Sequence, residues 1–159
     1  MKGNEKVIAL LNEVLKAELT AINQYFLHAE MCANWGYKKL AAVTRKESIE
    51  EMLHAEKLIE RILYLDGTPT MHELFPLRIG RTVKEQLEND LQVEYEAVPR
   101  LNRGIELTTS VGDNGSRELL VKILEDEEHH VDYLEAQLHI IKEAGLENYL
   151  AQHIHGEDH

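Results

Sequence analysis

Two short segments of the chain carry a glutamate followed three residues later by a histidine, a pair of side chains that can bind a metal ion. Glu51 and His54 form one pair in the segment IEEMLHAEK, and Glu127 and His130 form the other. Residues three apart lie on the same face of an α-helix, so each pair can offer a carboxylate and an imidazole to one ion. One pair alone is weak evidence, because this spacing also occurs by chance on acidic helical surfaces.

Both pairs interrupt apolar stripes, and the stripes predict buried helix faces. In four segments, apolar residues recur every three or four positions. Polar residues stand near the middle of each stripe: Glu18 in the first segment, Glu51 and His54 in the second, Glu94 in the third, and Glu127 and His130 in the fourth. Four carboxylates buried together would repel one another, and each would cost roughly several kcal/mol to desolvate. Two divalent cations would neutralise them.

These six residues therefore predict a paired metal site inside a helical bundle. Oxygen and nitrogen ligands without a thiolate favour a pair of iron or manganese ions over structural zinc. Other acids on the same helices are expected to be solvated surface residues: Glu47, Glu50, Glu56, Glu60, Glu125 and Glu128.

The elements that must position this site are four long helices. We predict them from about residue 4 to the break at 34–36, from 38 to 65, from near 82 to before Gly112, and from near 116 to Gly145. No alternating pattern predicts a strand. The link 66–81 is long enough to cross the length of a bundle, which would make the second and third helices parallel.

The expected fold is thus an all-α four-helix bundle with a long crossover between the second and third helices and a short fifth helix. We expect one domain over residues 1–159, with the bundle at about 4–144, the short helix at about 146–155 and a polar tail at 156–159. The short helix, LENYLAQHI, is expected to pack against another subunit, because four helices already close a core. The alternative is that it folds back over the end of its own bundle.

Composition limits the partners. The chain has 17 basic and 29 acidic residues and a net charge of −12, which argues against nucleic acid and anionic membranes. Cys32 is the only cysteine, so no internal disulfide or thiolate cluster can form. The start of the chain reads as neither a signal peptide nor a membrane span, and a cytoplasmic protein is expected.

Several segments resemble the bacterioferritin family, and the resemblance covers essentially the whole chain. They include AINQYFLHA, the region around ESIEEM, and GLENYL near the end. The resemblance implies a 24-subunit shell of two-fold dimers that oxidises Fe(II) with oxygen or hydrogen peroxide and stores a ferric mineral. It also implies two iron ions per subunit at the six residues named above, with Glu51 and Glu127 as bridging carboxylates. A reducing ferredoxin is a possible further partner.

The same resemblance assigns Met52 to haem b, one haem per pair of subunits. Met52 is turned away from Glu51 by a helical step of about 100° and shares a second apolar strip with Ile49, Ile59 and Leu63. One residue supplies both axial ligands only across a two-fold axis. Without the resemblance, packing is the ordinary role of a helical methionine. Tyr25 is expected just outside the metal ligands, either hydrogen-bonded to a bridging acid or supplying an electron, or simply packed in the core with its hydroxyl satisfied.

Two residues depart from the expected pattern. Lys46 stands where the family places an accessory iron ligand on the inner surface, with Glu50 beside it, so electron transfer from arriving iron is expected to be altered. Pro99 lies inside the third helix and removes one backbone hydrogen bond, which predicts a kink or bulge. His153, His155 and His159 are expected to belong to a solvated tail.

Two alternatives to iron storage remain open at this stage. A di-iron oxygenase or peroxidase would use the same ligands on a small substrate, although the rubrerythrin type needs a Cys-x-x-Cys module that this chain lacks. A purely structural bundle would leave four buried acids unexplained. Whether the irons stay at the site or pass through it is also open.

Overall fold

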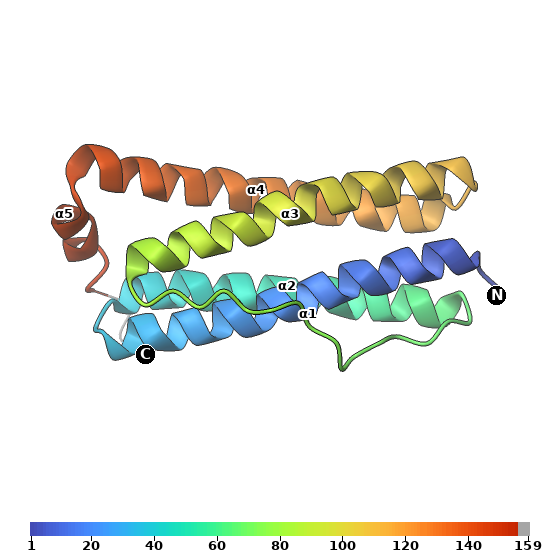
Figure 1. The fold of residues 1–159 in the computed structure, drawn as a ribbon, viewed down its shortest axis with the longest axis horizontal. Coiled ribbons are helices and arrows are strands. Elements are labelled where there is room, and N and C mark those ends of the chain that lie inside the picture. The colour runs from blue at the N-terminus through green and yellow to red at the C-terminus, as the bar shows by residue number, and fades with distance from the viewer. Residues whose placement is uncertain (156–159) are drawn as a thin grey trace.

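The computed structural model describes residues 1–155 and consists of four long helices and one short helix (Figure 1). The helices are α1 (Glu5–Asn34), α2 (Lys38–Tyr64), α3 (Val83–Ser110), α4 (Asn114–Ala144) and α5 (Leu146–Ala151). The four long helices confirm the expected boundaries to within two residues, and no strand occurs in residues 1–155. None of the helices in that range is both long and apolar enough to cross a membrane.

Two antiparallel hairpins build the bundle. α1 packs against α2 and α3 packs against α4, and α1 also contacts α3 (Figure 1). The crossover of residues 65–82 runs back along the bundle, so α2 and α3 are parallel, as predicted. Short-range caps define the helix starts: the Asn4 side chain accepts from the amides of Lys6 and Val7, and the Thr82 hydroxyl accepts from the amide of Glu85.

A polar stripe on α1 fastens the crossover to the bundle. The amides of residues 70, 75, 78 and 80 donate to Asn12 Oδ1, Thr20 Oγ1, Gln24 Oε1 and His28 Nε2, at 2.8, 2.9, 3.0 and 3.0 Å. These four side chains stand four or eight residues apart, so they form one row on the helix. The row satisfies backbone amides that would otherwise lose their partners and so holds the start of α3 beside α1.

The hydrophobic core is split into two clusters with a polar centre between them. One cluster joins α1 residues 7–15 to α2 residues 55–62 and to Leu65, and includes Leu101, Leu120 and Ile123. The other joins Cys32 and residues 40–41 to residues 83–91 and to Leu134, Ile141 and Tyr149. On every long helix, the polar residues of the predicted metal site fall between these two sets of positions.

Pro99 does not interrupt its helix. α3 is helical without a break from Val83 to Ser110 and contains no π turn. The predicted bulge is therefore wrong, because the flanking turns keep their regular bonding around the missing amide. A change of helix direction at Pro99 stays a prediction.

The short helix α5 lies over the end of its own bundle, which is the alternative that the sequence left open; contact of its outer face with another subunit stays a prediction. The Tyr149 side chain is buried in the second core cluster, and its hydroxyl donates to Gln137 Oε1 at 2.8 Å. The amide of Lys39 donates to the carbonyl of His153 at 3.0 Å, which ties the segment to the start of α2. The helix ends at Ala151 rather than near 155.

The predicted solvated tail is only partly described. His153 is half-buried and stacks on Tyr149 with 4.3 Å between ring centroids, so it is not a tail residue in solvent. His155 is exposed, as expected. The predicted polar tail at 156–159, with His159, lies outside the described residues.

Candidate metal centre

Glutamate and histidine side chains from α1, α2, α3 and α4 converge at the middle of the bundle. They form two groups that share two members: Glu18, Glu51, His54 and Glu127 in one, and Glu51, Glu94, Glu127 and His130 in the other. Within each group one ligand atom per residue lies within 4.8 Å of all the others, and every member is buried. The structure thus brings together all six residues that the sequence selected, and it places Glu51 and Glu127 between the two groups.

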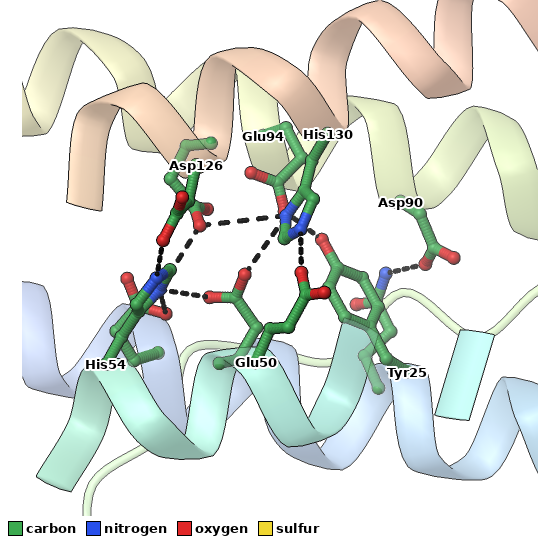
Figure 2. Close-up of polar contacts among 11 residues, drawn as sticks. Tyr25, Glu50, His54, Asp90, Glu94, Asp126 and His130 are labelled. Atoms are coloured by element: carbon green, nitrogen blue, oxygen red, sulfur yellow. Dashed lines mark hydrogen bonds and ion pairs between the residues drawn. The ribbon is translucent and has the colours of Figure 1, made fainter. Parts of the chain in front are cut away.

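The two imidazoles turn the same ring nitrogen toward the carboxylates. His54 Nδ1 lies 3.4 Å from Glu127 Oε1 and 3.6 Å from Glu18 Oε2. His130 Nδ1 lies 3.2 Å from Glu51 Oε1 and 3.7 Å from Glu94 Oε1. Figure 2 shows the two rings facing each other across the carboxylates, His54 from α2 and His130 from α4.

Seven buried atoms of these six residues lack hydrogen-bond partners, which tests directly whether the centre fits metal ions. All six residues have at least one such atom: Glu18 Oε2, both oxygens of Glu51, His54 Nδ1, Glu94 Oε2, Glu127 Oε1 and His130 Nδ1. Buried polar atoms in native proteins are nearly always satisfied, so a group of orphaned oxygen and nitrogen atoms needs an explanation. Two cations among them would satisfy all seven atoms at once.

Without metal, protonated histidines offset the charge of the buried carboxylates, as the direction of their pKa shifts shows. Burial opposes the charge on Glu51, but its contacts with the two histidines outweigh this and lower its pKa to about 2. Burial also works against a charged His130, yet the Glu51 and Glu94 carboxylates raise its pKa to about 12. The pKa of His54 is raised by Glu51 in the same way, again against the effect of burial.

The pKa of Glu127 is shifted in the opposite direction from that of Glu51. Burial, together with the charges of Glu51 and Glu94, raises the pKa of Glu127 well above its usual range. The two residues shared by both groups, Glu51 and Glu127, are therefore one carboxylate and one carboxylic acid in the metal-free protein, because two adjacent buried acids do not both ionise.

Tyr25 lies at the edge of the centre. Its side chain is fully buried, and its hydroxyl donates a hydrogen bond to Glu94 Oε1 (Figure 2). Burial and the Glu94 charge raise the pKa of Tyr25 well above its usual value, so the hydroxyl keeps its proton and remains a donor. The structure thus bonds Tyr25 to Glu94 and not to Glu51 or Glu127, the two acids expected to bridge, which corrects that part of the expectation. Electron supply stays a prediction.

Two carboxylates that were not expected from the sequence contact the outer nitrogens of the histidines. Asp126 Oδ2 lies 2.7 Å from His54 Nε2, and Glu50 Oε2 lies 2.8 Å from His130 Nε2. Glu50 was expected to be a solvated surface residue, and its half-buried contact corrects that. A signal was present, because each of these acids immediately precedes a glutamate that both groups share and stands four residues before a histidine.

Glu47 also departs from the expectation of a surface residue. Its side chain is buried, and this burial raises its pKa to about 8, with Asp90 and Glu94 adding to the rise and His130 opposing it. Glu47 stands one helical turn before Glu51, on the same face of α2, which is why it turns inward. The remaining acids of that set are exposed, as expected: Glu56, Glu60, Glu125 and Glu128.

Met52 lies outside the centre on the surface of α2. It is 53% exposed, and its strip neighbours Ile49 and Leu63 are 45% and 57% exposed. Ile49, Met52 and Leu63 of the predicted second apolar strip therefore lie on the outside of the chain, whereas Ile59 is half-buried against the first core cluster. The role of Met52 toward haem stays a prediction.

Comparison with known proteins places this centre within a family. A model of the ferritin-like domain matches residues 8–144, which include all six converging residues. Bacterioferritin BfrA of Mycobacterium tuberculosis is 52% identical over 152 residues, covering 96% of each chain. The chain belongs to the bacterioferritin family. The bacterioferritin of Streptomyces coelicolor is 52% identical over 95% of this chain and 90% of its own, and that of Brucella melitensis is 48% identical over 94% and 92%.

Proposed function

We propose that this chain stores iron and oxidises Fe(II) to Fe(III) at the centre formed by Glu18, Glu51, His54, Glu94, Glu127 and His130. The observation that carries the proposal is the set of seven orphaned ligand atoms on those residues. Membership of the bacterioferritin family supports iron as the metal, and the absence of thiolates from the ligand set agrees with it.

The residues divide into two roles toward Fe(II), which is the substrate. Glu18 with His54, and Glu94 with His130, each bind one ion from one side. Glu51 and Glu127 bind both ions and keep them adjacent, so that oxygen or hydrogen peroxide can take one electron from each. Four carboxylates balance the charge of two Fe(II) ions. Oxidation then leaves two extra positive charges, which favours hydrolysis of Fe(III) and its transfer to a mineral.

Assembly and haem binding form a further part of the proposal. The exposed strip of Ile49, Met52 and Leu63 is apolar, and an apolar strip of this kind is typical of a surface that another molecule covers. Two copies related by a two-fold axis would bring two Met52 thioethers together to hold one haem b. We propose dimers of this type in a 24-subunit shell, with haem passing electrons from a reducing ferredoxin to the stored iron.

One observation favours the alternative of oxidation of a small substrate. A groove of about 530 Å³ between α2 and α4 is bordered by His54 and Asp126 and is mostly apolar. A small organic molecule in this groove would lie next to one of the two metal positions. The similarity to bacterioferritins over almost the whole chain makes iron itself the favoured substrate.

The test is an anaerobic Fe(II) titration of the assembled protein followed by exposure to air. Wild type should bind about two Fe(II) per chain and oxidise them in a fast phase. Glu18→Ala should lose one ion and the fast phase, whereas Glu30→Ala, an exposed acid on the same helix, should behave as wild type. If Glu18→Ala keeps two ions and the fast phase, the proposal fails.

The haem part is tested separately by Met52→Leu, which keeps the apolar volume and removes the sulfur. Wild type should bind haem with the absorption spectrum of two thioether ligands, and the variant should lose that spectrum while its assembly is unchanged. A wild-type spectrum in the variant would rule out Met52 as the axial ligand.

A further inference from the structure

Two hydrogen bonds cross between α2 and α4 on the outer side of the metal centre. Asp126 of α4 contacts Nε2 of His54 on α2 at 2.7 Å, and Glu50 of α2 contacts Nε2 of His130 on α4 at 2.8 Å (Figure 2). The two contacts repeat one motif, an acid immediately before the bridging glutamate, with the partners exchanged between the helices.

The exchange is not what helical spacing alone would produce. Glu50 stands four residues before His54 and Asp126 four residues before His130, so each acid shares a helix face with the histidine of its own helix. Each instead binds the histidine of the opposite helix. Both imidazoles are therefore held from across the centre, and the two halves of the site are linked without any metal.

These bonds determine which nitrogen is free to bind an ion. A carboxylate accepts, so the outer Nε2 of each ring must carry hydrogen and donate it. In the neutral imidazole, the other nitrogen, Nδ1, then has a free lone pair. Nδ1 is the nitrogen that points into the centre in both histidines and lacks a hydrogen-bond partner there. The outer acids thus orient the ring and select its tautomer.

We propose that Glu50 and Asp126 are positioning residues, each serving one metal position: Asp126 through His54 at the Glu18 position, and Glu50 through His130 at the Glu94 position. This inference rests on the proposed metal centre. Bonds of this kind typically improve metal affinity by about 10–100-fold.

The two positions are not equivalent. The Asp126 side chain is 54% exposed and borders the open groove, whereas that of Glu50 is 39% exposed and does not line this groove. Water competes better for an exposed hydrogen bond. Loss of Asp126 should therefore lower the affinity for the metal ion at the Glu18 position by about 10-fold. Loss of Glu50 should lower the affinity at the Glu94 position by closer to about 100-fold.

The experiment measures Zn(II) binding to the assembled, metal-free protein by calorimetry, which involves no oxidation. Wild type should bind two Zn(II) per chain. Glu50→Ala and Asp126→Ala should each lower the affinity for one of the two Zn(II) ions by about 10–100-fold and leave the affinity for the other near its wild-type value. Glu50→Gln and Asp126→Asn should recover part of the loss, because the amide oxygen still accepts from Nε2–H.

Matched controls separate positioning from charge. Glu56→Ala and Glu125→Ala each remove one exposed carboxylate close to the same place, and neither residue bonds to a histidine in the described part of the chain. Both should bind Zn(II) as wild type does. If the controls lose as much affinity as the alanine variants, the effect is one of charge and the positioning role is wrong.

A spectroscopic readout completes the test. With Co(II) in place of Zn(II), the visible d–d absorption reports coordination geometry at each ion, so each alanine variant should alter about half of the wild-type spectrum. Failure of wild type to bind two ions would overturn the metal centre itself. Two ions bound with wild-type affinity and spectrum in both alanine variants would overturn only the positioning role.

Discussion

Filling the metal centre should release about three protons at pH 6. In the metal-free protein, the raised pKa values leave His54 and His130 as imidazolium and Glu127 as a neutral acid at that pH. Two cations need both Nδ1 atoms free and Glu127 ionised, so each group gives up one proton on binding. Glu51 contributes none, because its pKa is already lowered to about 2.

The magnitude follows from linkage. Each proton released changes the logarithm of the binding constant by one per pH unit, so the product of the two metal constants should rise by up to about 1,000-fold per pH unit near pH 6. This corresponds to about 4 kcal/mol per pH unit for the pair of ions. The sign is fixed by the direction of the shifts: protons compete with the metal, so affinity increases as pH rises.

Calorimetry with Zn(II) in two buffers of different ionisation enthalpy counts these protons directly. Glu127→Gln removes one titrating group and should release about two protons, while Glu125→Gln, on the neighbouring exposed position, should still release about three. Release of less than one proton by wild type, together with an affinity that does not change with pH, would refute the assignment of these three groups.

Three further predictions concern single side chains. Tyr25→Phe removes the donor to Glu94 and should lower the free energy of unfolding of the metal-free protein by about 1–3 kcal/mol in urea, and an unchanged value would contradict the bond. Gly80→Ala would drive its Cβ into the backbone amide of Gln86, so it should lower the free energy of unfolding by about 1–3 kcal/mol in thermal unfolding; wild-type stability would show that the crossover shifts to make room at little cost. Lys46→His replaces an exposed ammonium with an imidazole that can bind iron, and it should speed growth of the ferric core after the paired site is filled, measured by absorbance; an unchanged rate would count against a role for this position.

The long helices and the six converging residues are predictable from the sequence because their signals are local or periodic. Asn4 and Thr82 cap helices through amides only two or three residues away. The six polar residues stand out because they interrupt stripes that are otherwise apolar, and burial in a bundle follows directly from such stripes.

The contacts around the site are not predictable in the same way, because they join distant parts of the chain. The bonds of Asp126 and Glu50 to histidine connect residues 72 and 80 apart, and helical spacing suggested the histidine on the wrong helix. The burial of Glu47 did have a local signal, its position one turn before Glu51. α5 lies on its own bundle because Tyr149 packs into an apolar site formed by distant residues of the second core cluster. That site exists only in the packed core, so the sequence does not show it.

The most direct test of the proposed centre is the position of bound metal in crystals loaded anaerobically with Fe(II), located by anomalous scattering. Two ions should appear per chain, about 3.5–4 Å apart, both in contact with Glu51 and Glu127. One should also contact Glu18 and His54 Nδ1, and the other Glu94 and His130 Nδ1. A single bound ion, or iron bound elsewhere with none in contact with these residues, would contradict the proposed paired metal centre.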